Sequence, residues 1–162
     1  MKLPRIRSWV LICLALLAAQ AQADSRLLPF DARSPAALRQ ANAGRPFVLV
    51  FWSVHCAPCF AEMAQWRAYR KQFPGIPIIQ VATEPLDESN AILSVLDRYD
   101  AGTTGHLAFA DDYAEKIRHA VDPKWRGETP RVYFYDRDHK RVARSGAMDA
   151  EWTSRWLEQQ SR

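Results

Sequence analysis

The chain has 162 residues and a formal net charge of +4, with 48% of its residues hydrophobic and 25% charged. This length and composition predict one globular domain with an ordinary hydrophobic core. The sequence has no block of like charge and no basic stripe interleaved with aromatic residues, so we do not expect nucleic acid as a partner.

Residues 1–23 have the pattern of a cleavable export signal. Three basic residues come first: Lys2, Arg5 and Arg7. An apolar run from Trp9 to Ala19 follows, too short to span a bilayer comfortably, and Ala21-Gln22-Ala23 offers the small residues of a cleavage site. We therefore expect an exported, periplasmic protein whose mature chain is a single domain over residues 24–162. Loss of the leader removes Cys13 and leaves a net charge of +1, because the leader has no acidic residue.

The first half of the mature chain alternates between helix and strand signals. Ser34-Pro35 is a typical helix start and Gly44 a typical stop, and the apolar residues 47–51 are typical of a strand buried on both faces. We expect a helix over 35–43, a strand over 45–51, a helix from Cys56 to about Phe73 and a strand over 76–82. The short stretch after the cleavage site is expected to be unstructured.

The second half continues this pattern and closes with a hairpin and a helix. Ser89 is expected to cap a helix whose apolar residues share one face: Ile92, Leu93, Leu96 and Tyr99. A short strand over 107–110, a helix over 112–121 and hairpin strands over 131–135 and 140–145 follow. Asp149 is expected to cap the last helix, which bears Trp152, Trp156 and Leu157. The sum predicts an α/β sandwich with a mixed central sheet flanked by helices.

Two cysteines, Cys56 and Cys59, stand three positions apart between the expected buried strand and the helix that follows it. Cys56 would lie at the helix start, where unpaired N–H groups and the helix dipole favour a thiolate. Because the thiolate is the nucleophile of thiol–disulfide exchange, we expect Cys56 to attack and Cys59 to resolve the mixed disulfide. After leader cleavage these are the only cysteines left in the chain.

The residues around this pair resemble a known family. The order Phe-Trp-x-x-x-Cys-x-x-Cys after an apolar strand, with Thr129-Pro130 downstream, resembles the thioredoxin fold. The segment from Cys59 to Met63 resembles the Cys-x-x-Glu-Met segment of the TlpA/ResA-like exported thiol–disulfide oxidoreductases. The stretch between Glu84 and Pro123 looks like the helix and strand that this branch inserts in mid-chain. The resemblance therefore implies a thioredoxin-like sandwich with a mid-chain insertion.

The resemblance also implies roles for individual residues. Pro130 would follow a cis peptide bond and face the dithiol, and Thr129 would offer its backbone to an incoming polypeptide. Trp52 would pack near the cysteines and belong to the substrate-binding surface. Glu62, three residues after Cys59 on the same helical face, would accept the proton that Cys59 loses; the alternative is a solvated helix residue.

Two residues depart from the family pattern. Val50 stands where cytosolic thioredoxins carry a buried aspartate, so proton transfer cannot follow that route. His55 stands where tryptophan is commoner, directly before Cys56. An imidazole beside the thiolate would lower the pKa of Cys56 and make the protein more oxidising, unless His55 is only an exposed neighbour.

The expected function is that of an exported thiol–disulfide oxidoreductase, a reductase rather than an oxidase, with a role in cytochrome c maturation or thiol maintenance. Its redox-active Cys56–Cys59 disulfide would be the only cofactor, without a metal. Its partners would be disulfide-bearing exported proteins and a membrane electron donor of the thiol-transfer type, and the protein would be a monomer. The alternatives are a copper-delivery module, because two thiolates suit Cu(I), a low-turnover binding module of a secretion apparatus, and a structural disulfide.

Overall fold

A computed structural model of the chain describes residues 27–99, 106–110 and 113–162. The expected leader and Cys13 lie outside the described residues, as does Asp112 at the expected start of one helix. In these three ranges no helix is both long and apolar enough to cross a membrane.

The described elements alternate between strands and helices. The strands are β1 (Leu27–Phe30), β2 (Phe47–Trp52), β3 (Ile78–Pro85), β4 (His106–Phe109), β5 (Arg131–Tyr135) and β6 (Arg141–Ser145). The helices are α2 (Ser34–Ala41), α3 (Ala57–Gln72), α4 (Ser89–Tyr99), α5 (Ala114–Val121) and α6 (Ala150–Gln160), with a short 3-10 turn, η2 (Leu86–Glu88), before α4.

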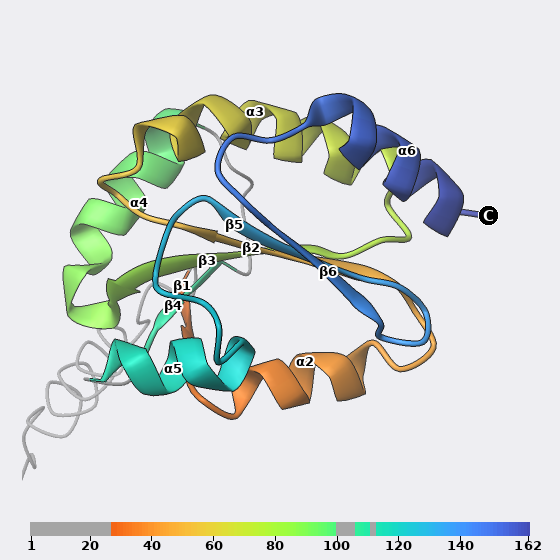
Figure 1. Cartoon of the computed structure of the whole chain (residues 1–162). Helices are drawn as coiled ribbons and strands as arrows, with labels where there is room; N and C mark the ends of the chain where they lie inside the picture. Colours follow the sequence, from red (N-terminus) through yellow and green to blue (C-terminus); the bar gives the residue numbers. More distant parts are fainter. Residues whose placement is uncertain (1–26, 100–105, 111–112) are drawn as a thin grey trace, which may run out of the picture.

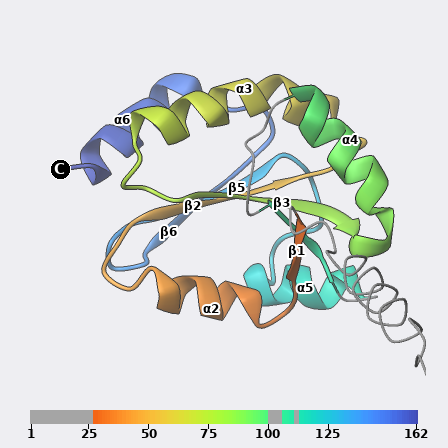
Figure 2. The same ribbon diagram turned by 180° about the vertical axis from the view of Figure 1, so that it is seen from behind.

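The strands form one mixed sheet in the order β1-β4-β3-β2-β5-β6. Neighbouring strands from β1 to β2 are parallel, whereas β5 is antiparallel to both β2 and β6. Helices α3 and α6 cover one face of the sheet, with α4 beside α3, and α2 and α5 cover the other face (Figures 1 and 2). The predicted α/β sandwich with a mixed central sheet is therefore confirmed.

The central strand β2 is buried along its whole length, as its continuous apolar sequence predicts. Phe47, Leu49 and Phe51 point to one face and join the core under α2 and α5. Val48 and Val50 point to the other face and join the core under α3 and α6. Burial on both faces fixes the register of β2 and hence the position of the loop that follows it.

The segment expected to be unstructured forms an edge strand instead. Leu27–Phe30 is β1, which pairs in parallel with β4. Its stability comes from tertiary contacts, because the fully buried ring of Phe30 packs on Phe51 and Phe109 with ring centroids 5.6 and 6.1 Å away. Strand β4 lies between β1 and β3, so α4 and β4 are the additional helix and strand expected in mid-chain.

Strand β3 also runs further than predicted, to Pro85 rather than Ala82. Its pairing with β4 shifts register between Ala82 and Pro85. Such an irregularity tolerates a proline, which cannot donate a ladder hydrogen bond. The extension carries Glu84 to the end of the sheet at which β2 also ends.

The hairpin and last helix follow the prediction. In the hairpin, Arg131 of β5 lies opposite Ser145 of β6. Asp149 caps α6 by accepting the Trp152 N–H at 2.9 Å. Two buried residues of α6, Trp156 and Leu157, complete the core on the α3 side of the sheet.

Candidate active site

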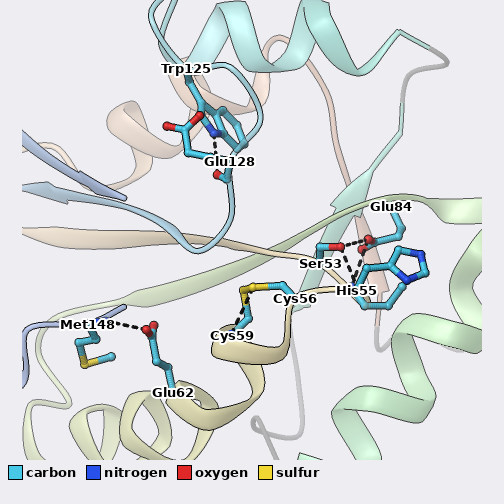
Figure 3. The surroundings of a disulfide bond; sticks show 10 residues. Ser53, His55, Cys56, Cys59, Glu62, Glu84, Trp125, Glu128 and Met148 are labelled. Carbon is cyan, nitrogen blue, oxygen red and sulfur yellow. Dashed lines mark hydrogen bonds between the residues drawn. A yellow bond between two sulfur atoms is a disulfide. The ribbon is translucent and has the colours of Figure 1, made fainter. Parts of the chain in front are cut away.

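Cys56 and Cys59 form a disulfide at the start of α3, with their Cα atoms 5.2 Å apart (Figure 3). Cys56 is the N-cap residue, and its Sγ accepts the backbone N–H of Cys59 at 3.2 Å. Pro58 lies between them and offers no N–H of its own. The sulfur of Cys56 therefore lies where a helix N-terminus stabilises a thiolate, as the sequence predicts.

Both cysteines of the disulfide are largely buried. Cys56 is 6% exposed and Cys59 3%. The residues between them, Ala57 and Pro58, are exposed. Cys56, at the helix N-terminus, is thus the slightly more exposed residue of the two, which is consistent with attack by Cys56 and resolution by Cys59.

The Thr129–Pro130 segment lies at the same end of the sheet as the disulfide. The peptide bond between the two residues is cis, in agreement with the expectation from sequence. Arg131 lies opposite Phe51 in the antiparallel ladder between β5 and β2. Pro130 therefore lies level with the end of β2, from which the chain leads to Cys56. Pro130 is buried and Thr129 is partly exposed.

Glu62 is a buried carboxylic acid on α3, one helical turn after Cys59. Its side chain points toward the segment before α6, where its Oε1 accepts the Met148 N–H at 2.6 Å (Figure 3). Burial raises the pKa of Glu62, and the hydrogen bond from Met148 opposes this shift without cancelling it. At 8% exposure, the alternative of a solvated helix residue is excluded.

Trp52 packs in the cluster that contains both cysteines, together with Met63 and Ala82. This agrees with its expected place beside the dithiol. Its ring is only 2% exposed, however, so Trp52 supports the cysteines from inside and leaves almost no surface for the expected contact with a substrate.

The two departures from the family pattern occupy different surroundings. Val50 is buried in the core between the sheet and α3. His55 is exposed beside the dithiol, and its backbone N–H donates to Ser53 Oγ at 3.1 Å.

Sequence reasoning missed Glu84, which fixes the loop before Cys56. Its Oε1 accepts the Ser53 hydroxyl at 2.6 Å and the Val54 N–H at 3.1 Å (Figure 3). Glu84 is 7% exposed. A signal was present, because an acid near the end of a strand parallel to β2 reaches the sheet edge where the dithiol loop begins.

The described residues include no group of three or more His, Cys, Asp or Glu side chains arranged to hold a metal ion.

No family model matches the chain, and no curated protein matches it in sequence. Solved structures do match. A secreted disulfide oxidoreductase of Mycobacterium tuberculosis, homologous to E. coli DsbE, is 22% identical with a TM-score of 0.59, covering 74% of this chain and 85% of that one. A DsbE-type thiol:disulfide interchange protein from Chlorobium tepidum is 16% identical with a TM-score of 0.62, covering 76% and 84%. StoA from Bacillus subtilis is 17% identical with a TM-score of 0.53, covering 71% and 84%.

These similarities show the fold of the chain. It is the thioredoxin-like fold of thiol–disulfide oxidoreductases, as predicted from sequence, and it carries a Cys-x-x-Cys disulfide at the start of α3.

Proposed function

We propose that this protein is an exported, periplasmic thiol–disulfide oxidoreductase that reduces or exchanges disulfides in other exported proteins. The observation that carries the proposal is the hydrogen bond from the Cys59 N–H to Cys56 Sγ at the N-terminus of α3. The same donor and helix dipole would stabilise the Cys56 thiolate of the reduced protein. The fold shared with solved thiol–disulfide oxidoreductases supports this reading.

The reaction transfers two electrons in two exchanges. In the first, the Cys56 thiolate attacks one sulfur of a substrate disulfide; a Cys56–substrate disulfide forms and the other substrate sulfur leaves as a thiolate. In the second, the Cys59 thiolate attacks Cys56 Sγ, which forms the Cys56–Cys59 disulfide and releases the second substrate thiolate. Both substrate thiolates then take up protons. The substrate is reduced and the dithiol of the protein is oxidised.

Glu62 would act in the second exchange. Cys59 must lose a proton before it attacks, and a buried carboxylate one turn along α3 with a raised pKa is suited to accept it. The hydrogen bond from Met148 holds this carboxylate against the segment before α6. A thiol-transferring electron donor in the membrane would then reduce the Cys56–Cys59 disulfide for the next cycle.

The direction of exchange depends on the reduction potential of the pair relative to its partners. We propose reductase work, such as cytochrome c maturation or thiol maintenance. A measured potential near about −270 mV, as in thioredoxin, would support a reductase, and one near about −120 mV would instead support an oxidase.

The substitution Cys59→Ser tests the function. The variant should accumulate mixed disulfides with exported proteins through Cys56, because the resolving thiol is gone. The matched control, Cys56→Ser, should trap none. Absence of trapped partners, together with no reduction of insulin by the wild-type protein, would refute the proposal. Stoichiometric Cu(I) binding by the reduced protein without insulin reduction would instead support copper delivery.

A further inference from the structure

Two charged residues flank the Thr129–Pro130 segment, one on each side, and they contact each other. Arg131 Nη1 donates to Glu128 Oε1 at 3.2 Å. The second terminal nitrogen, Nη2, donates to Asp122 Oδ2 at 3.1 Å. The side chains of Arg131 and Asp122 are only 13% and 7% exposed, so their bond forms largely out of water, whereas Glu128 is 43% exposed and its bond to Arg131 lies at the surface. The ion pair between Glu128 and Arg131 therefore spans Thr129 and Pro130, the two residues that lie beside the dithiol.

Glu128 is held by its backbone as well as by its carboxylate. Its carbonyl accepts the Trp125 Nε1–H at 2.9 Å, and Trp125 itself is buried in the core (Figure 3). Its Oε2 accepts the Arg126 N–H at 3.1 Å, and its Oε1 also accepts the Ser145 hydroxyl at 2.8 Å. The N-terminal side of the segment is therefore bonded to the core and to β6.

Asp122 anchors the C-terminal side of the segment through Arg131. Besides Arg131, its carboxylate accepts the Tyr133 hydroxyl at 3.3 Å and forms an ion pair with Arg141 Nη2 at 3.1 Å. Burial alone would raise the pKa of Asp122, but the Lys124 N–H and the charge of Arg141, with smaller contributions from Tyr133 and Arg131, outweigh burial and lower it. Asp122 is therefore charged at neutral pH and links Arg131 to both hairpin strands.

The backbone groups of Thr129 and Pro130 differ in their hydrogen bonding. The Pro130 carbonyl accepts the Gly146 N–H at 3.0 Å. Within the described ranges, neither the N–H nor the carbonyl of Thr129 is bonded to another residue. These contacts thus hold Glu128 and Pro130, the two neighbours of Thr129, whereas the N–H and carbonyl of Thr129 remain available for hydrogen bonds.

We propose that Arg131, Glu128 and Asp122 form a positioning cluster that holds the Thr129 backbone ready to bind the polypeptide substrate. This inference rests on the proposed function. A segment ordered before binding loses less conformational entropy when a polypeptide pairs with it, so the cluster lowers the KM for protein disulfides. A small disulfide, which needs no backbone pairing, gains nothing from the cluster.

The test compares two substitutions that each remove one arginine partner of Asp122. Arg131→Met breaks the contacts to Glu128, Asp122 and the Ser145 hydroxyl. Arg141→Met leaves these contacts in place and breaks those of Arg141 to Asp122 and the Val121 carbonyl. Steady-state reduction of insulin and of hydroxyethyl disulfide is measured with the mature chain. For Arg131→Met we expect a rise of about tenfold in the insulin KM, with kcat and the rate on hydroxyethyl disulfide within about twofold of wild type. Arg141→Met should leave the insulin KM within about twofold of wild type.

Two further measurements protect the test against a variant that fails to fold. Glu128→Gln keeps the backbone carbonyl that Trp125 uses, but it loses the negative charge and replaces one acceptor oxygen with an NH2 group, so it should raise the insulin KM in the same direction by a smaller factor. Arg131→Lys should recover part of the loss in Arg131→Met, because one donor remains. Hydrogen exchange at the Gly146 amide should accelerate in Arg131→Met and not in Arg141→Met, since this amide bonds the Pro130 carbonyl.

The inference is overturned if Arg131→Met slows both disulfides equally, or if Arg141→Met raises the insulin KM as much. Either result would make the cluster purely structural. Failure of the proposed function can be distinguished from failure of this inference, because the wild-type protein would then reduce neither insulin nor hydroxyethyl disulfide. Hydrogen exchange at the Gly146 amide would still report whether Arg131 holds the Thr129–Pro130 segment in place.

Discussion

Glu84 and Ser53 are predicted to stabilise the dithiol loop as a coupled pair. The carboxylate is buried and accepts the Ser53 hydroxyl at 2.6 Å and the Val54 N–H at 3.1 Å. A hydrogen bond to a charged group contributes about 1.5–3 kcal/mol, so Ser53→Ala should lower the free energy of unfolding by about that amount. Glu84→Ala loses both bonds and leaves the Val54 N–H without its acceptor, and should cost about 3–5 kcal/mol.

A double-mutant cycle measures the shared bond. The double variant should be more stable than the sum of the single effects predicts, by a coupling free energy of about 1.5–3 kcal/mol. Urea unfolding of the oxidised protein gives each value, and Glu88→Ala, an exposed acid in η2, is the control expected to change stability by less than about 0.5 kcal/mol. Single effects that add to within about 0.5 kcal/mol would show that the two side chains do not stabilise the loop together.

Three other predictions concern α3 and α6. Glu62→Gln should slow release of reduced substrate from the mixed disulfide by about 100-fold, because an amide cannot accept the Cys59 proton; stopped-flow kinetics that match wild type would contradict this. Because burial raises the pKa of Glu62 in the folded state, the wild-type protein should lose stability relative to Glu62→Gln as the pH rises through that pKa. If the free energies of unfolding of the two proteins, measured in urea from pH 4 to 8, change in parallel, Glu62 does not titrate as described. Leu157→Ala leaves a cavity at a fully buried position between α6 and the sheet and should lower the free energy of unfolding by about 2–5 kcal/mol. The control is Glu158→Ala, a substitution of its exposed neighbour. A loss below about 1 kcal/mol in Leu157→Ala would mean that the core closes around the cavity.

Much of the fold and the centre of the site follow from local sequence signals. The apolar run of β2, the hairpin of β5 and β6 and the cap at Asp149 each depend on residues close together in the chain. Such signals predict strands, turns and helix ends without knowledge of any distant contact. The pair Cys56–Cys59 needs only a strand on one side and a helix on the other, so its place at a helix N-terminus is also encoded locally.

The tertiary structure determined the elements and contacts that join distant segments. Strand β1 has little signal of its own and forms because β4, far along the chain, pairs with it. The partners of Glu62 and Glu84 likewise come from remote segments: Met148 lies before α6 and Ser53 after β2. Whether an acid is solvated or buried depends on what covers it, and spacing along one helix or strand does not contain that information. The sequence therefore located the dithiol, whereas only packing decided which charged side chains surround it.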